Sequence, residues 1–305
     1  MKLNGEESLA EWRVGLTGSR GFVGTRVAHA LEKLGATVVP FRRHAGVGDE
    51  SIEWLPGREL HLDDRFRTLD AIVHLAGEPI VGRWTTRKKR EIERSRVEGT
   101  AHLCEAVAKL DRKITIVCAS GTGFYGTVSS ENATESDPLG SGFLAQVCAK
   151  WEAATGSASA AGHRVVIPRI GLVLGKEGGA LAKMLMPFRM MVGGRVGSGQ
   201  QWMSWISIED LVRMILWMLQ TPSVSGHFNA VSPEPVKNID FTKALGAALR
   251  RPTIAPVPEA ALHLLFGEMA KETLLANQHV VPARALEMGF EFQDTSLEAL
   301  FARIL

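Results

Sequence analysis

The chain contains few cysteines and almost no tyrosine. Among its 305 residues are three cysteines, Cys104, Cys118 and Cys148, and a single tyrosine, Tyr125. The cysteines follow no metal-ligand spacing, and a sparse, odd set argues against a disulfide framework. We therefore expect a reducing, cytoplasmic location and no metal site.

A strong net charge and long apolar runs are also absent. The formal net charge is +2, which gives no general reason to expect nucleic acid or an anionic membrane as a partner. The longest apolar stretch, near Leu211–Leu219, is interrupted by Arg213, so we expect no membrane span. Residues 1–12 are polar and lack the apolar core of a signal peptide. A small-molecule partner and a monomer or homodimer are expected.

Strand-like and helix-like segments alternate through the first two thirds of the chain. Predicted strands cover 13–17, 37–41, 71–75, 114–119 and 165–170, and predicted helices cover 22–34, 86–109 and 143–161. This order predicts an α/β protein with a Rossmann-like, doubly wound parallel sheet. After residue 175 glycine, methionine and proline become frequent. We expect a cofactor-binding domain over 13–175, to which 204–232 returns, and a smaller capping domain made of 176–203 and 233–305.

The most informative motif is Thr17–Gly24, where a predicted strand turns through three glycines into a predicted helix. Such glycines allow a tight turn, close approach of a pyrophosphate and close packing of the helix on the strand. The helix N-terminus then offers free N–H groups and partial positive charge to phosphates. The expected cofactor contacts in this loop are Gly18, Ser19, Arg20, Gly21, Phe22, Val23 and Gly24. A purely structural turn is the alternative.

The end of the second predicted strand indicates which dinucleotide binds. Arg42 and Arg43 stand where an NAD site usually carries an acid for the ribose 2′-hydroxyl, and no acid follows until Asp49. Arg20 can reach the same point, and guanidinium groups suit a 2′-phosphate. These residues favour NADP over NAD as the cofactor, unless Arg42 and Arg43 are solvated loop charges.

Several motifs together carry a family resemblance. They are Thr17–Gly24, His74–Gly77, Ser120 with Tyr125-Gly126, Gly77–Ile80, Arg83–Thr85, Ser95-Arg96, Cys148, Trp151-Glu152, Arg169–Gly175, Gly178–Ala180, Gly197–Gln201, Phe228–Pro233 and Phe266–Met269. The chain resembles the extended short-chain dehydrogenases/reductases, and within them the sugar-nucleotide-epimerase-like branch with a C-terminal domain of unknown function. This likeness implies further cofactor contacts from Leu75, Ala76, Gly77, Ser120 and Arg169.

The acid–base pair that the resemblance implies is absent. In the superfamily a Tyr-x-x-x-Lys pair moves a proton during hydride transfer, because the lysine lowers the tyrosine pKa. Here Phe143 or Leu144 occupies the tyrosine position, and Val147 or Cys148 the lysine position. Ser129, not lysine, stands four residues after Tyr125.

Two residues are therefore the candidate catalytic groups. Ser120 matches the active-site serine of the superfamily and would hold the reacting oxygen, unless it is a turn or cap hydroxyl. Tyr125 is either the catalytic acid or base, with a water as the alternative proton donor, or a tyrosine that is packed in the core or contacts substrate. Cys148 would face the nicotinamide, or it is a buried and inert thiol.

The predicted substrate-binding residues are Glu78, Arg83, Cys148, Gln200 and Trp202. Met203 stands near the place of an arginine that binds the diphosphate in nucleotide-sugar enzymes, which argues against such a substrate. Three functions remain open. They are an NADP-dependent oxidoreductase or epimerase-like enzyme acting on a small carbonyl or hydroxyl compound, a non-catalytic NADP-binding sensor or interaction module, and a structural protein with a vestigial cofactor.

Overall fold

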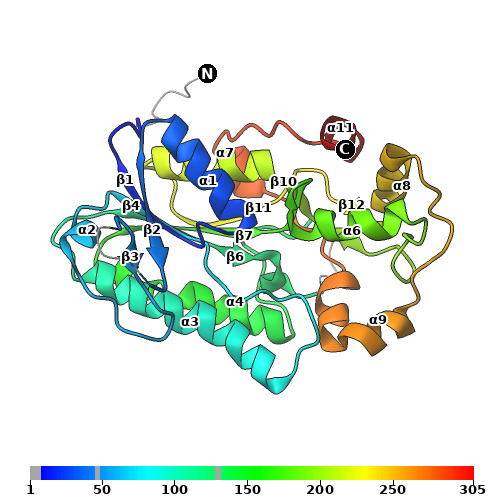
Figure 1. Cartoon of the computed structure of the whole chain (residues 1–305), viewed down its shortest axis with the longest axis horizontal. Coiled ribbons are helices and arrows are strands. Elements are labelled where there is room, and N and C mark those ends of the chain that lie inside the picture. The colour runs from blue at the N-terminus through cyan, green and yellow to red at the C-terminus, as the bar shows by residue number, and fades with distance from the viewer. Residues whose placement is uncertain (1–7, 45–48, 128–131) are drawn as a thin grey trace.

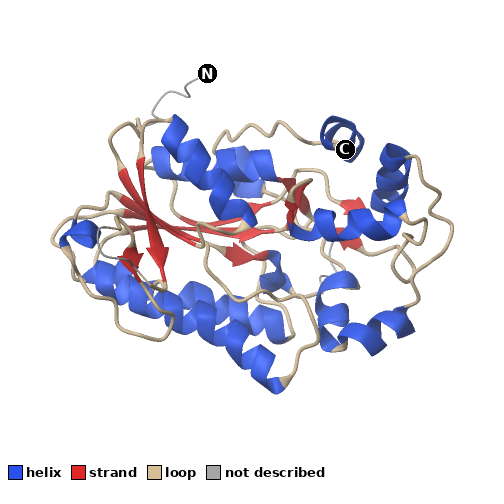
Figure 2. Cartoon of the chain, viewed as in Figure 1, coloured by secondary structure: helices blue, strands red, loops and turns tan. Residues whose placement is uncertain are grey.

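The computed structural model describes residues 8–44, 49–127 and 132–305, and its centre is a parallel sheet between two layers of helices (Figures 1 and 2). The sheet order is β11-β7-β5-β4-β1-β2-β3, with β6 also paired to β7. These strands are β1 (Arg13–Thr17), β2 (Thr37–Arg42), β3 (Ile52–Glu53), β4 (Ala71–His74), β5 (Thr115–Cys118), β6 (Ser120–Gly121), β7 (Arg164–Ile170) and β11 (Gly226–Ala230). The predicted Rossmann-like α/β fold is confirmed.

The central strands are apolar because helices cover both of their faces. Every residue of β4 and β5 is buried, as expected for parallel strands between two helical layers. The helices of one layer are α1 (Phe22–Lys33) and α7 (Ile208–Gln220), and those of the other are α3 (Thr86–Ala108), α4 (Phe143–Ala153) and α5 (Gly156–Ala160) (Figure 1). A short helix, α2 (Asp64–Arg67), precedes β4.

The single helix predicted over 143–161 is divided in two. α4 ends at Ala153 and α5 begins at Gly156. The Thr155 hydroxyl donates a hydrogen bond of 2.7 Å to the carbonyl oxygen of Glu152, three residues earlier. This side-chain bond competes with the regular helical pattern, which is why threonine favours a break at this point.

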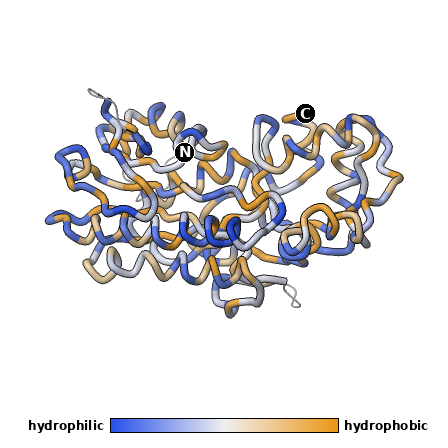
Figure 3. Tube along the Cα trace, turned by 60° about the horizontal axis from the view of Figure 1, so that its bottom comes forward, coloured by the Kyte–Doolittle hydropathy of each residue, from blue (hydrophilic) through white to orange (hydrophobic). Residues whose placement is uncertain are grey.

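A second region lies at the other end of the molecule (Figure 1). It contains α6 (Gly179–Arg189), α8 (Asn238–Leu249), α9 (Glu259–Phe266) and α11 (Leu297–Ile304), with the antiparallel pair β9 (Trp202–Met203) and β12 (Val236–Lys237). Leu181, Phe241 and Phe301 belong to a hydrophobic cluster separate from those of the sheet. Buried apolar clusters lie on the sheet as well, so each region has an apolar core of its own. Figure 3 shows the hydrophobic stretches of chain in both regions.

Short elements connect the two regions. β8 (Leu172–Gly175) pairs in parallel with β10 (Trp205–Ser207), and α7 follows β10 directly and returns the chain to the sheet. The single turn η1 (Thr122–Tyr125) follows β6, while η2 (Ala270–Leu274) and α10 (Ala283–Glu287) lie in the last quarter of the chain. Across the described part of the chain, every helix is too short or too polar to cross a membrane.

Candidate cofactor and reaction site

The three glycines of the first loop are required by close backbone contacts. Gly18 has a φ of +69°, a left-handed conformation that favours glycine, and its carbonyl oxygen accepts a hydrogen bond of 2.9 Å from the Gly21 N–H. A Cβ on Gly24 would lie 2.2 Å from the Gly18 oxygen, and a Cβ on Gly21 would lie 3.2 Å from it. The loop therefore forms the tight strand-to-helix turn that the glycine spacing predicts.

The same loop leaves the start of α1 available to an anion. Gly21 precedes the helix, its position is not capped by any side chain of the described residues, and the first turn contains no acid. The N–H groups of Phe22, Val23 and Gly24 therefore have no partner within the helix and lie at its positive end. This cradle, whose loop backbone a side chain on Gly24 would displace, fits the pyrophosphate of a dinucleotide.

A buried hydrogen-bond network supports the cradle from below. The Thr17 hydroxyl oxygen accepts from the N–H groups of Leu75 (3.0 Å) and Ala76 (3.1 Å), and it is also bonded to His74 Nδ1 at 2.8 Å. The other ring nitrogen of His74 lies 3.0 Å from the Thr100 hydroxyl. Burial lowers the pKa of His74 to about 4, so the ring is neutral at pH 7. It joins the carboxyl ends of β1 and β4 to α3.

The predicted 2′-phosphate residues lie at the end of β2. Arg20 and Arg43 are exposed, while Arg42 Nη1 is bonded to Asp49 Oδ2 at 2.6 Å. Arg42 Nε is buried and has no hydrogen-bond partner among the described residues. The next four residues after His44 lie outside the described part. The structure thus joins Arg42 to the first acid that follows it, and it leaves the buried Nε of Arg42 without a partner among the described residues.

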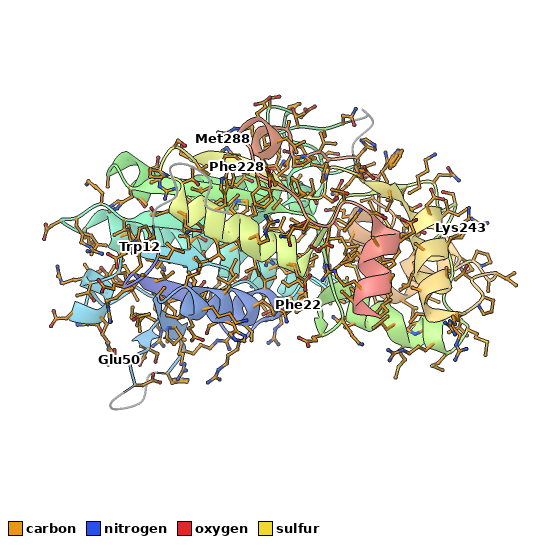
Figure 4. The ribbon with its side chains drawn as sticks, turned by 90° about the horizontal axis from the view of Figure 1, so that it is seen from above. Trp12, Phe22, Glu50, Phe228, Lys243 and Met288 are labelled. Carbon is orange, nitrogen blue, oxygen red and sulfur yellow. The ribbon has the colours of Figure 1, made fainter. Side chains whose placement is uncertain are left out.

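Phe22 connects the cradle to the second region. Figure 4 places it at the end of α1 that faces that region. A Cβ on either Gly175 or Gly178 would come within 2.5 Å of the Phe22 ring, so this close contact depends on those glycines. The segment between β8 and α6 therefore covers one side of the cradle.

A buried ion pair forms the centre of the predicted reaction site. Arg169 binds Glu152 through two bonds, Nε to Oε1 at 2.9 Å and Nη2 to Oε2 at 2.8 Å. Ser120 donates its hydroxyl proton to Glu152 Oε1 at 2.6 Å, and His227 Nε2 lies 3.2 Å from Oε2. Burial opposes ionisation of Glu152, but bonds from His227, Arg169 and Ser120 outweigh it and lower its pKa to about 2.

Tyr125 extends this network. Its hydroxyl donates to Asn229 Oδ1 at 2.7 Å and accepts from Arg169 Nη1 at 2.9 Å. The side chain is only 3% exposed, and burial raises its pKa despite the adjacent guanidinium. The Arg169 guanidinium also lies 3.5 Å from the centre of the Phe124 ring. In this arrangement the Tyr125 proton is directed to Asn229, so its proposed use as an acid stays a prediction.

Cys148 lies beside this network at the carboxyl end of β6. Its sulfur would be 3.9 Å from a Cβ on Gly121 and 3.7 Å from a Cβ on Gly123. Burial raises the pKa of the thiol to about 11, so it is protonated at pH 7. The structure thus brings together Ser120, Tyr125, Cys148 and Arg169. The hydroxyl groups of Ser120 and Tyr125 both donate hydrogen bonds to buried side chains.

Sequence reasoning gave no role to several residues that complete this site. Glu152 and Asn229 appear only within family motifs, and His227 is not singled out at all. Glu152 could have been noticed because it is an acid on the buried side of α4. Arg169 is likewise a charged residue within an otherwise apolar strand. A charge at an otherwise apolar position usually has a buried partner. Nothing in the sequence indicates His227.

The predicted substrate residues do not form one group. Gln200 and Trp202 line a cavity of about 400 Å³ with Gln201, Lys237 and Asn277. Glu78 Oε1 instead accepts from Lys88 Nζ at 2.5 Å, and Arg83 donates to the carbonyl oxygen of Leu264 at 3.0 Å. Lys237 was missed by sequence reasoning; its Nζ lies 3.3 Å from Gln200 Oε1.

The fold and the cradle together define a Rossmann-type protein, and comparison with known proteins gives its family. The chain belongs to the NAD dependent epimerase/dehydratase family, whose model matches residues 14–231. Residues 257–304 match a domain of unknown function, DUF1731. The branch that the motifs resemble, including its C-terminal domain, is confirmed.

Relatives of similar length are found in bacteria, plants and animals. The chain is 38% identical to the "Epimerase family protein Mb2239" of Mycobacterium bovis, over 94% of this chain and 96% of that protein. It is 37% identical to the "Epimerase family protein SDR39U1 homolog, chloroplastic" of Arabidopsis thaliana, over 96% and 86%. The crystal structure of human epimerase family protein SDR39U1 (isoform 2) with NADPH is similar at a TM-score of 0.85 and 34% identity, over 96% of this chain and 98% of that one. The cytoplasmic location stays a prediction.

Proposed function

We propose that this protein binds NADP(H) and catalyses hydride transfer between that cofactor and a small carbonyl or hydroxyl compound. The observation that carries the proposal is the glycine cradle at Gly18–Gly24, with unpaired N–H groups and without an acid. The arginines at the end of β2 support the choice of NADP over NAD. The similar human protein was crystallised with NADPH, which supports the same choice.

Each part of the site has a separate role in this proposal. The first N–H groups of α1 hold the pyrophosphate, and Arg20, Arg42 and Arg43 hold the 2′-phosphate. The bound cofactor supplies or accepts the hydride. Ser120 retains lone pairs that accept a hydrogen bond from a substrate hydroxyl, although its own proton goes to Glu152. Because Tyr125 is bonded on both sides, we assign it to positioning Arg169, and water then exchanges the proton with the substrate oxygen.

Cofactor selectivity tests the binding part of the proposal. NADPH and NADH are titrated against the wild-type protein and the Arg42→Ala and Arg43→Ala variants, with cofactor fluorescence as the readout. Each arginine variant should weaken NADPH binding by about tenfold and leave NADH binding unchanged, because only NADPH carries the 2′-phosphate. Arg67→Ala, which removes an exposed arginine of the neighbouring α2, is the matched control. Equal affinity of the wild-type protein for both cofactors would contradict the choice of NADP.

Turnover tests the chemical part. NADPH absorbance is followed in the presence of a panel of aldehydes, ketones and 2-oxo acids, and NADP⁺ reduction is followed with the matching alcohols. Consumption of NADPH that requires both protein and carbonyl compound is expected. Tight NADPH binding without turnover for any compound would refute hydride transfer and leave cofactor binding intact.

A non-catalytic NADP-binding module is the second candidate. It is favoured by one observation, that the hydroxyl protons of Ser120 and Tyr125 are both directed to buried partners beside a protonated Cys148. A site of this kind holds no free acid or base. If the protein is such a module, affinity capture should recover different partner proteins with the NADP⁺-loaded and the NADPH-loaded forms. Identical partners in both states would contradict a redox sensor.

A further inference from the structure

Arg96, on α3, is a half-buried cation beside the reaction site. Its Nη1 donates to two neutral acceptors, the carbonyl oxygens of Glu78 at 2.9 Å and Ile92 at 3.3 Å. Its guanidinium lies 5.1 Å from the centre of the Trp151 ring. Within residues 8–44, 49–127 and 132–305, Arg96 forms no ion pair: the Glu78 carboxylate is bound to Lys88, and its charge acts on Arg96 without a direct contact.

The guanidinium packs against the turn that follows β4, at the carboxyl edge of the sheet. A Cβ on Gly77, in the turn after β4, would be 3.1 Å from the Arg96 guanidinium carbon. At Cys148, burial and the charge of Glu152 raise the thiol pKa and the Arg96 cation opposes them. The positive charge of Arg96 thus acts on the thiol of Cys148, which is one of the two positions at which the family resemblance predicts a lysine.

This arrangement favours an anionic ligand. A cation removed from water is costly unless a negative group contacts it, and burial lowers the pKa of Arg96 more than the charge of the Glu78 carboxylate raises it. Across the described residues, the hydrogen bonds of Arg96 all come from Nη1, so Nε and Nη2 are left for a ligand. A guanidinium presents such N–H groups in a planar fork that matches the two oxygens of a carboxylate.

Other charged groups near the centre are already paired. Arg169 is bound by Glu152, and Lys150 Nζ is bonded to Glu93 at 2.6 Å on the outer side of α4. The cofactor phosphates are served by the glycine cradle and by the arginines after β2. An anion that binds to Arg96 would therefore belong to the substrate rather than to the cofactor.

We propose that Arg96 binds a carboxylate of the substrate, which makes the substrate a small 2-oxo or 2-hydroxy acid. This inference rests on the proposed hydride-transfer function and specifies its substrate class. A carboxylate on Arg96 holds the adjacent carbonyl carbon near the turn after β4, at the carboxyl edge of the sheet where the cofactor is expected. It also selects acids over the uncharged aldehydes and ketones of the same size.

Ligand binding to the NADP⁺-loaded protein tests this proposal without requiring turnover. Pyruvate, 2-oxobutyrate and phenylpyruvate are titrated by calorimetry, each against its uncharged amide. The wild-type protein should bind at least one acid and prefer it to its amide by tenfold or more. Arg96→Gln should lose that preference, and Arg96→Lys, which keeps the charge without the fork, should retain part of it. Arg94→Gln is the control, because Arg94 lies on the same helix, is exposed and pairs with Glu98.

The other outcomes separate this proposal from the function it rests on. NADPH affinity should be unchanged in all three variants, and near-UV circular dichroism shows whether each one is folded. If Arg96→Gln and Arg96→Lys instead weaken NADPH binding and carboxylates do not bind, Arg96 serves the cofactor phosphates and the proposal is wrong. Equal binding of acids and amides by the wild-type protein also overturns it. Failure of the wild-type protein to bind NADPH refutes the proposed function itself.

Discussion

The two halves of the candidate site are built in different ways. The cradle consists of backbone, and its three glycines matter because they lack a side chain. The reaction site consists of side chains that bond to each other, with Glu152 and Arg169 at its centre. The first half can be formed by one short segment of chain, whereas the second needs partners from α4, β6, η1, β7 and β11.

This difference determines how each half should fail. A substitution in the cradle introduces a steric overlap that acts mainly on cofactor binding. A substitution in the reaction site leaves a buried charge or hydroxyl without a partner, which acts mainly on the stability of the fold. Four experiments test this contrast.

The largest effect is expected from breaking the buried ion pair. Arg169→Met leaves the Glu152 carboxylate buried without its bidentate partner and should lower the free energy of unfolding by about 3–5 kcal/mol. Lys150→Met, which removes the exposed pair with Glu93, should change it by less than about 1 kcal/mol. Urea unfolding measures both. The double variant Arg169→Met with Glu152→Leu should regain part of the loss, and a larger loss in the double variant would contradict this account.

Acid should weaken the two halves in different pH ranges. The folded-state pKa of His74 is about 4 against an ordinary 6.5, and that of Glu152 is about 2 against 4.5. In each range the unfolded chain binds more protons, so stability is lost as the pH falls from 6.5 to 4 for His74 and from 4.5 to 2 for Glu152. Each loss is about 3 kcal/mol.

The free energy of unfolding, measured against pH, checks this order. His74→Gln should flatten the curve between pH 6.5 and 4, and Glu152→Gln should flatten it below pH 4.5. His74 supports the cradle, so NADPH binding should weaken in the upper range while the reaction-site network is still intact. A wild-type curve that is level from pH 6.5 to 4 would show that His74 is not buried in its neutral form.

Adding one methyl group to the cradle should have a moderate effect on stability. Gly24→Ala places a Cβ 2.2 Å from the Gly18 oxygen, so the backbone has to shift, at a cost of about 1–3 kcal/mol. NADPH affinity should fall more than stability suggests, because the displaced N–H groups are those that bind phosphate. Gly156→Ala, where a Cβ meets nothing within 4 Å, is the control and should be neutral or slightly stabilising. Unchanged NADPH affinity in Gly24→Ala would count against the cradle.

The smallest effect concerns the charge beside Arg42. Asp49→Asn removes the carboxylate bonded to Arg42 and should strengthen NADPH binding by about threefold to fivefold, with NADH unchanged. Asp111→Asn, an exposed acid before β5, is the control. Fluorescence titration measures the effect. If both cofactors gain equally, Asp49 does not act through the 2′-phosphate.

The parts of the site that were predictable are those encoded by local sequence. Short apolar segments, which alternate with helix-like segments, predict the bounds of β1, β4 and β5 to within one residue at each end. The spacing of Gly18, Gly21 and Gly24 predicts the turn that the structure contains. The break between α4 and α5 was missed, because it depends on a single Thr155 hydroxyl bond inside a helix-favouring segment. The pairing of Glu78 with Lys88, in the first turn of α3, could not be predicted either, and the role of Glu78 in substrate binding stays a prediction.

The sequence by itself determined the order of the main strands and helices in its first two thirds, the glycine turn at Gly18–Gly24 and the absence of the Tyr-x-x-x-Lys pair. Each of these depends on residues close together in the chain, where spacing and side-chain volume are sufficient. Only the tertiary structure decided that Ser120 and Tyr125 share one network with Glu152 and Arg169, and that Arg96 packs against the turn after β4 without an ion pair among the described residues. Those contacts join segments up to about a hundred residues apart, and they depend on which strand lies next to which in the sheet.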